Sequence, residues 1–311
     1  MKILIPILTS LMSLYSLAFA DEPVMNDGVI LINGVNQYYK VIGEGEPFIV
    51  LHGGPGMYHD ELLPFFEEFS KTHKVIFYDQ RGNGRSPLDE VSEETFSTDL
   101  MVEDLEEFRK FFNIETLNIV GHSWGGLLSM YYAARYPEHV KRLILVCSAP
   151  TNTELLIASY KNQISRFTPA EWEHIQELWN SEAYKAGNPD VHNEAMRLNE
   201  GKTFHNKSLI DSYMEVAQFS QETALNVVAL EDLARDMKLN ISVEKNLAGF
   251  QAPTLIVNGR EDFIVPEVPE RIHQLIPGSK IVWIEESGHY PFIEQRRVFF
   301  DTLNQFIEES R

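Results

Sequence analysis

Gly121-His122-Ser123-Trp124-Gly125 is the stretch that decides the fold of this 311-residue chain. An apolar run at 117–120 predicts a strand directly before it, and residues 125–136 predict a helix that Pro137 ends. A serine between glycines at a strand-to-helix turn is typical of a nucleophile elbow, in which a strained backbone exposes the hydroxyl at the positive end of the helix dipole. Ser123 is therefore the candidate nucleophile.

Strand and helix patterns alternate on both sides of this turn. Short β-branched and apolar runs predict strands at 48–51, 75–78, 117–120, 143–147, 254–257 and 281–284. Residues 30–40 predict a hairpin that turns at Asn33-Gly34 and adds an antiparallel edge. The alternation predicts an α/β fold with a mostly parallel sheet flanked by helices.

The alternation stops between Pro150 and about Gly249, where only helical patterns are found. Thr168-Pro169-Ala170-Glu171 is a capping box, and it predicts a helix that carries Trp172, Ile175 and Trp179 on one face. We therefore expect a core made of residues 21–150 and 250–311, with a helical cap at 151–249 inserted between its two parts.

Residues 1–20 are expected to be a signal peptide. Lys2 precedes an apolar stretch that ends in Ala18-Phe19-Ala20, the small-x-small pattern of a cleavage site. An uncleaved membrane anchor is the alternative, but Pro6 and several hydroxyl side chains make the stretch a poor spanning helix. The expected location is the periplasm or the extracellular space. Cys147 is the only cysteine, so no intrachain disulfide can form.

Composition excludes several kinds of partner and ligand. The chain has 26 Lys and Arg against 46 Asp and Glu, a formal net charge of −20, which argues against nucleic acid and against stable membrane attachment after signal cleavage. Its ten histidines are scattered without the spacing of zinc ligands, so we expect no metal site. The sequence carries no signal for an oligomeric state.

A serine nucleophile needs a base and an orienting carboxylate, which follow it in the order acid, then histidine. His289 comes directly after the last predicted strand. Glu261 and Asp262 both follow the strand before it, and both qualify by position. His122 adjoins the nucleophile but has no separate carboxylate to support it in the sequence. His273 falls on a predicted helix and is expected at the surface.

An oxyanion hole requires two backbone N–H groups. The residue after the nucleophile, Trp124, supplies one candidate amide. The other is expected in the loop His52-Gly53-Gly54-Pro55-Gly56, which follows an early strand and whose glycines permit close backbone approach. An ordinary tight turn is the alternative for that loop.

Several motifs resemble the α/β-hydrolase superfamily and, more narrowly, the proline iminopeptidases, which are serine aminopeptidases. They are His52-Gly53-Gly54-Pro55-Gly56, Asp79-Gln80-Arg81-Gly82-Asn83-Gly84-Arg85-Ser86, Gly121-His122-Ser123-Trp124-Gly125-Gly126, the spaced set Gly259, Asp262 and Pro266, and Gly288-His289. The resemblance runs from Gly28 to the C-terminus and is weak through the predicted cap.

The resemblance implies Ser123 as nucleophile, His289 as base and Asp262, rather than Glu261, as the orienting acid. It assigns the oxyanion donors to the amides of Gly54 and Trp124. It also implies release of an N-terminal residue, often proline, from a small peptide through an acyl-enzyme, without a cofactor.

Three positions bear on this implied specificity. Family members hold the substrate ammonium with glutamates, and Glu231 falls where one subgroup keeps its cap glutamate, although a solvated helix carboxylate is an equal alternative. Phe263 stands where some members have a second glutamate, and His122 stands where a small residue is usual. An ester or lactone hydrolase with the same triad is the alternative function, because it needs no ammonium site.

Overall fold

The computed structural model describes residues 27–311. The predicted signal peptide, residues 1–20, lies outside the described residues. Across the part that is described, no helix is both long and apolar enough to cross a membrane.

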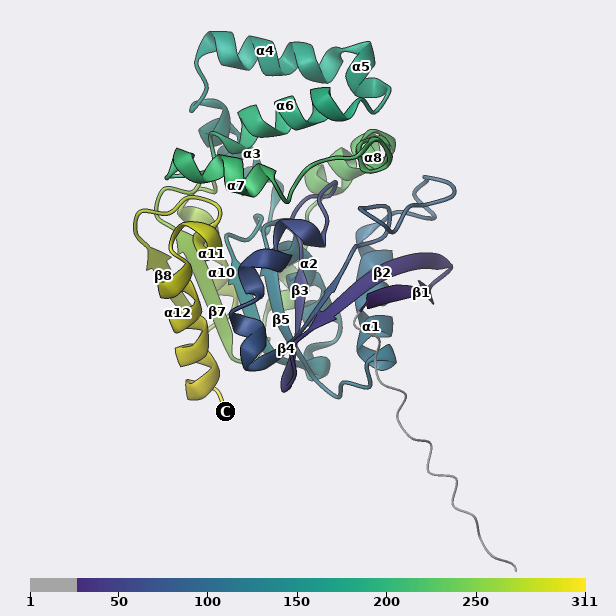
Figure 1. The fold of residues 1–311 in the computed structure, drawn as a ribbon. Helices are drawn as coiled ribbons and strands as arrows, with labels where there is room; N and C mark the ends of the chain where they lie inside the picture. Colours follow the sequence, from purple (N-terminus) through teal and green to yellow (C-terminus); the bar gives the residue numbers. More distant parts are fainter. Residues whose placement is uncertain (1–26) are drawn as a thin grey trace, which may run out of the picture.

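An eight-stranded sheet forms the centre of the fold (Figure 1). Its order is β1-β2-β4-β3-β5-β6-β7-β8. Strand β2 is antiparallel to both of its neighbours, β1 and β4, and all other neighbouring strands are parallel. The strands are β1 (Asp27–Ile32), β2 (Val35–Ile42), β3 (Glu46–Leu51), β4 (His73–Tyr78), β5 (Leu117–His122), β6 (Val140–Val146), β7 (Thr254–Gly259) and β8 (Lys280–Ile284). The predicted hairpin and every predicted strand are present, and the α/β fold class is confirmed.

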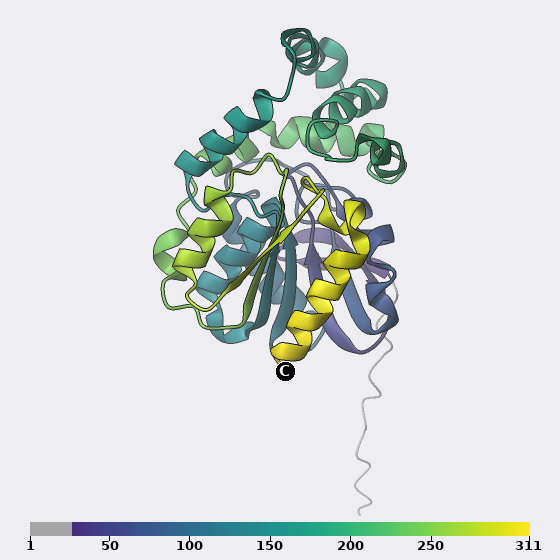
Figure 2. The same ribbon diagram turned by 90° about the vertical axis from the view of Figure 1, so that its left-hand side faces the viewer.

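Two apolar layers cover the faces of the sheet. Helices α1 (Thr98–Phe111), α2 (Trp124–Arg135) and α10 (Glu267–Leu275) bury side chains against one face. The 3-10 helix η2 (Leu63–Phe66) and helices α11 (Pro291–Glu294) and α12 (Arg296–Glu309) cover the other. Figure 2 shows the yellow α12 on the opposite side of the sheet from α10. The remaining short 3-10 helices of the core are η1 (His59–Glu61), η3 (Phe69–Lys71) and η4 (Pro137–His139).

The segment between β6 and β7 is helical, and its first helices lie over one end of the sheet (Figure 1). It contains α3 (Thr153–Ile164), α4 (Pro169–Asn180), α5 (Glu182–Lys185), α6 (Pro189–Glu200), η5 (Lys207–Leu209), α7 (Ile210–Met214), α8 (Gln221–Leu239) and α9 (Glu244–Leu247). The capping box of Thr168 and Glu171 opens α4 as expected, and Ile175 on that helix is fully buried.

The end of this segment returns to the core. Val243 and Leu247, at α9, are fully buried in the same apolar cluster as α2, although they fall inside the range 151–249 predicted for the cap. The exact division of the chain at 150 and 249 stays a prediction.

Sheet order fixes where a ligand can bind. The chain runs from β3 outward to β4 on one side, then returns to β5 on the other side of β3. A crevice forms outside the carboxyl ends of parallel strands at such a switch point. The loops after β3 and β5, which contain Gly54 and Ser123, therefore meet at this crevice.

Candidate active site

Ser123 occupies the sharp turn between β5 and α2. Its φ of 52° lies in the left-handed region, which few non-glycine residues adopt. The glycines beside it are required by space: a Cβ at Gly125 would lie 2.4 Å from the carbonyl oxygen of Leu51, and one at Gly121 would lie 2.4 Å from that of Gly125. The two glycines therefore allow the strand and the helix to approach closely, and this close approach makes the strained turn possible.

His289 and Asp262 come together from the loops after β8 and β7. Nδ1 of His289 lies 2.9 Å and 3.1 Å from the two carboxylate oxygens of Asp262, and both side chains are buried. Burial lowers the pKa of the His289 imidazole, but the charge and hydrogen bond of Asp262, together with the charges of Glu200 and Glu61, outweigh burial, so the net shift of this pKa is upward. The imidazole is therefore held by a carboxylate in one orientation, with Nδ1 as the donor.

The structure distinguishes the two carboxylates that the spacing left open. Glu261 accepts a hydrogen bond from the backbone N–H of Ser287 at 3.0 Å and is partly exposed, whereas Asp262 faces His289. Asp262 also accepts the N–H of Ile264 at 3.2 Å, and its backbone carbonyl accepts from the guanidinium of Arg166. His273 is exposed on α10, as expected.

The loop after β3 is fixed by hydrogen bonds from its own N–H groups. The amide of Gly53 donates to Oε1 of Glu61 at 2.7 Å, and the amide of Gly56 donates to Oδ1 of Asn83 at 2.6 Å. Between them, Gly54 has a φ of 110°, which favours glycine. Trp124 is the first residue of α2, so its N–H has no partner within the helix.

Gln80 joins this loop to the elbow. Its side-chain amide donates to the carbonyl of His52, and its side-chain oxygen accepts the indole N–H of Trp124, both at 3.0 Å. The loops after β3, β4 and β5 are therefore cross-linked beside Ser123.

A chain of buried polar groups near Ser123 was not predicted from the sequence. The hydroxyl of Tyr213 donates to Oε2 of Glu61 at 3.1 Å and lies 3.0 Å from the hydroxyl of Tyr290, which donates to Oε2 of Glu200 at 2.8 Å. Burial alone would raise the pKa of Glu61, but His122 and the N–H of Gly53 lower it further than burial raises it. Glu61 is therefore an ionised carboxylate at neutral pH.

His122 lies near a carboxylate that the sequence did not indicate, but no carboxylate accepts a hydrogen bond from its imidazole among the described residues. Its Nδ1 lies 3.9 Å from Oε1 of Glu61, which is too far for a hydrogen bond. Its Nε2 lies 3.0 Å from the backbone carbonyl of His289, to which it donates. His122 therefore supports the His289 loop. The sequence could not indicate this contact, because Glu61 is distant along the chain.

Glu231 is not brought together with the other candidate residues. It is exposed on α8 and is not among the residues that line the cavity over Ser123. The cap glutamate that does line this cavity is Glu200, the last residue of α6.

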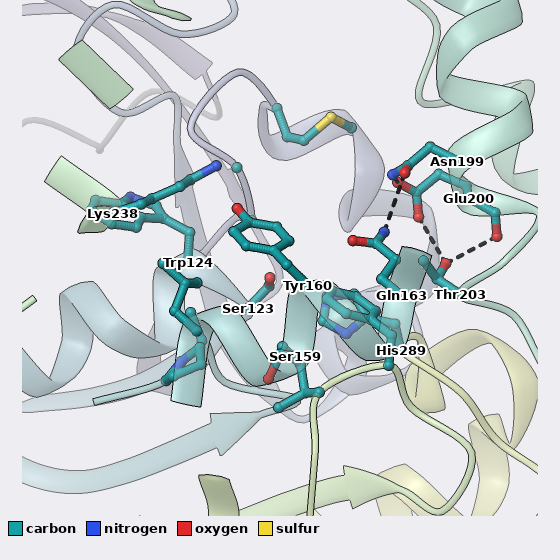
Figure 3. A pocket seen from close by; sticks show the side chains of 18 of the residues that line it. Ser123, Trp124, Ser159, Tyr160, Gln163, Asn199, Glu200, Thr203, Lys238 and His289 are labelled. Atoms are coloured by element: carbon teal, nitrogen blue, oxygen red, sulfur yellow. Dashed lines mark hydrogen bonds between the residues drawn. The ribbon is translucent and has the colours of Figure 1, made fainter. Parts of the chain in front are cut away.

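The cavity over Ser123 has a volume of about 520 Å³ and lies between the core and the cap (Figure 3). Ser123, Gly54, Trp124 and His289 all line it. Its walls are largely apolar and include Leu127, Leu156, Phe167, Trp172, Ile241 and Phe263. Charged side chains are few: Glu61, Glu200 and Lys238 line it in addition to His289. A concave, mostly apolar site with a few polar groups is typical of a small-molecule binding site.

The comparisons with known proteins agree with this geometry. The alpha/beta hydrolase fold family matches residues 46–295. The chain belongs to the α/β-hydrolase family. It is 30% identical to a proline iminopeptidase of Saccharolobus solfataricus over 92% of this chain and 93% of that protein. It is also 30% identical to a proline iminopeptidase of Thermoplasma volcanium over 91% of this chain and 97% of that protein.

A solved structure adds a different activity to the relatives of this α/β-hydrolase. The meta-cleavage product hydrolase from Pseudomonas fluorescens is 27% identical, with a TM-score of 0.69 over 91% of this chain and 98% of that one. The relatives establish that the protein is a hydrolase and favour a peptidase, without fixing the bond that it cleaves.

Within residues 27–311, one group of side chains has the composition of a metal site. Cys147, Asp262 and His289 are buried, and their ligand atoms lie within 4.8 Å of one another. Nδ1 of His289 is already engaged by Asp262. The expectation that this α/β-hydrolase has no metal site stays a prediction.

Proposed function

We propose that this α/β-hydrolase is a serine hydrolase that releases the N-terminal residue, proline among others, from short peptides. The observation that carries the proposal is one cavity with two sets of groups. It contains Ser123 beside the hydrogen-bonded pair of His289 and Asp262, and it contains buried or half-buried carboxylates at Glu61 and Glu200. The first set suits acyl transfer, and the second suits a cationic peptide N-terminus.

In the proposed reaction, the hydroxyl of Ser123 attacks the scissile carbonyl while Nε2 of His289 takes its proton. Asp262 holds the imidazole in the tautomer that leaves Nε2 free, and it stabilises the imidazolium that forms. The amides of Gly54 and Trp124 donate to the oxyanion.

Collapse of the tetrahedral intermediate completes the first half of the reaction. His289 returns its proton to the leaving amine, and the first residue of the peptide remains as an ester on Ser123. Water then attacks this ester with His289 again as base, which releases the amino acid and restores the serine hydroxyl.

We assign the substrate ammonium to Glu200 in place of Glu231. The carboxylate of Glu200 is held by the hydroxyls of Tyr290 at 2.8 Å and Thr203 at 2.9 Å, and it lines the cavity. A carboxylate fixed by hydroxyl donors can accept an ammonium without losing side-chain freedom on binding. Glu231, exposed on α8, has no such position.

Replacing Glu200 by Gln tests this assignment. We expect KM for a prolyl amide to rise about tenfold, because a charge-assisted hydrogen bond to the ammonium is lost, while hydrolysis of a simple ester is nearly unchanged. Glu231→Gln is the matched control and should change neither. An equal loss on amide and ester in Glu200→Gln would mean that Glu200 acts through folding.

Hydrolysis of an ester or lactone is the second candidate function. It is favoured by the apolar walls and by Phe263, whose ring lies 4.7 Å from the ring of His289, where some family members have a second carboxylate. Such a reaction would use Ser123, His289 and Asp262 in the same roles.

Substrate profiling separates the two functions. We expect release of naphthylamine from proline β-naphthylamide, loss of that release in Ser123→Ala, and no release from the N-acetylated compound, which has no ammonium. Rapid turnover of p-nitrophenyl esters with no release from any aminoacyl amide would instead establish the esterase and reject the peptidase.

A further inference from the structure

Lys238 is the one lysine among the described residues that lines the cavity. It lies in the last turn of α8 and is half-buried. Figure 3 shows Lys238 and Glu200 on opposite sides of Ser123, with the ammonium end of Lys238 extended toward the middle of the cavity. The cavity therefore has an anionic side and a cationic side, with the candidate nucleophile between them.

Lys238 has no anionic partner in the part of the chain that the structure describes. Several other lysines do form ion pairs, each with a nearby carboxylate. Lys202, for example, pairs with Glu171 at 2.6 Å. Lys238 forms no ion pair or side-chain hydrogen bond within residues 27–311, although it faces a cavity whose walls are largely apolar. A partly desolvated ammonium in such surroundings is stabilised by any anion that binds beside it.

We infer that Lys238 binds the free C-terminal carboxylate of the substrate, so that the enzyme selects dipeptides and tripeptides. The inference rests on the proposed function. With the substrate ammonium at Glu200 and the scissile carbonyl at Ser123, the leaving part of the peptide extends toward the opposite side, where Lys238 lies.

The size of the cavity fits this class of substrate. An extended chain spans at most about 3.3–3.6 Å per residue, so a dipeptide or tripeptide covers about 7–11 Å. A cavity of about 520 Å³ is in the range that encloses small ligands. A peptide of this length presents an ammonium at one end and a carboxylate at the other, which matches the arrangement of Glu200 and Lys238.

The test compares prolylglycine with prolylglycinamide, which differ only in the charge of the C-terminus. In the unaltered enzyme we expect the free acid to have a KM about five- to tenfold lower than the amide. This is the effect expected of a charge pair that is partly buried. Lys238→Gln should raise KM for the free acid to that of the amide, with kcat and the amide's KM unchanged. Lys238→Arg should keep the preference.

Lys245→Gln is the matched control, because Lys245 is exposed on α9 nearby in the sequence and does not line the cavity. It should leave both KM values unchanged. Equal KM values for the acid and the amide in the unaltered enzyme, or a preference for the acid that survives in Lys238→Gln, would overturn the role of Lys238 while leaving the peptidase intact. Failure to cleave either dipeptide, together with turnover of esters, would reject the proposed function and this inference with it.

Discussion

Asp262 sets the chemistry of His289 through a pair of short contacts in a buried site. In the proposed mechanism the imidazole must be neutral to accept a proton from Ser123, so activity would require a pH above the pKa of His289. Burial lowers that pKa, but the charge and hydrogen bond of Asp262, with smaller contributions from the charges of Glu200 and Glu61, raise it above the ordinary 6.5. The single carboxylate therefore moves the lower limit of the active pH range upward.

A pH profile tests this at the level of the residue. We expect kcat/KM for proline β-naphthylamide to fall with decreasing pH through an apparent pKa above 6.5. In Asp262→Asn the two largest contributions that raise this pKa are gone while burial remains, so the limb should move to lower pH. The maximal rate should fall on the order of 10³–10⁴-fold, because the imidazole is no longer held in the active tautomer. An unshifted limb in Asp262→Asn would contradict the assignment of the limb to His289.

Some residues of the candidate site could be predicted from the sequence, and others could not. Ser123 and His289 each follow an apolar strand within a few positions, so local pattern and chain order predict them. The same pattern left Glu261 and Asp262 both open, and only the family resemblance favoured Asp262. Glu61 and Glu200 have no such local signal: their burial depends on Tyr213, Tyr290 and the packing of the cap onto the core. Glu231 could not be separated from Glu200 in the sequence, because which face of a cap helix meets the cavity is a tertiary property.

At the scale of elements, α1 is joined to the loop after β4 by a buried ion pair. The guanidinium of Arg81 donates twice to the carboxylate of Asp104 on α1, at 2.6 Å and 2.5 Å, and both side chains are almost fully buried. Asn33, at the β1–β2 turn, also donates to Asp104 at 2.9 Å. The motif segment 79–86 is thereby held against α1 and the edge hairpin, and this segment supplies Gln80 beside Trp124.

Removing one partner of this pair should destabilise the protein strongly. We expect Asp104→Asn to lower the free energy of unfolding by about 3–5 kcal/mol, because it leaves a buried guanidinium without a counter-charge. Asp99→Asn on the same helix is the control, with an effect within about 1 kcal/mol, since Asp99 is exposed and pairs with Arg135 at 3.5 Å. Urea unfolding followed by circular dichroism measures both. Similar values for the two variants would contradict the role given to Asp104.

The same scale shows what patterns along the chain can predict. The strands were predictable because parallel strands buried on both faces are short apolar runs with turn residues around them. The 3-10 helices η1 to η3 were not, because their short turns carry no periodicity. The return of α9 to the core was also not predictable, because it depends on Val243 and Leu247 packing against α2.

At the scale of the whole molecule, cap helices lie over one end of the sheet (Figure 1), and residues of both the cap and the core line the cavity. Under the proposed function, a peptide must fit between core and cap to reach Ser123, and we expect a folded protein not to fit. Turnover should therefore fall as the peptide substrate becomes longer, even when the first peptide bond stays the same.

A series of peptides that begin with proline and lengthen by one glycine tests this limit. We expect kcat/KM to be highest for the dipeptide and tripeptide and to fall at least about tenfold by six residues, because an extended hexapeptide spans about 20 Å. A folded protein with an N-terminal proline should not be cleaved; mass spectrometry of the products measures each rate. Constant kcat/KM along the series would contradict closure of the cavity by the cap.

The two ends of the cap lie side by side, because Asn152 and Ser242 form an antiparallel bridge. A segment that leaves and re-enters a scaffold at neighbouring points can be lengthened, shortened or exchanged without stretching the scaffold. With the roles proposed above, substrate choice, through Glu200 and Lys238, can therefore change separately from bond cleavage, through Ser123 and His289. A chimaera that carries another hydrolase's segment between residues 152 and 242 would acquire a new substrate specificity while keeping its catalytic residues.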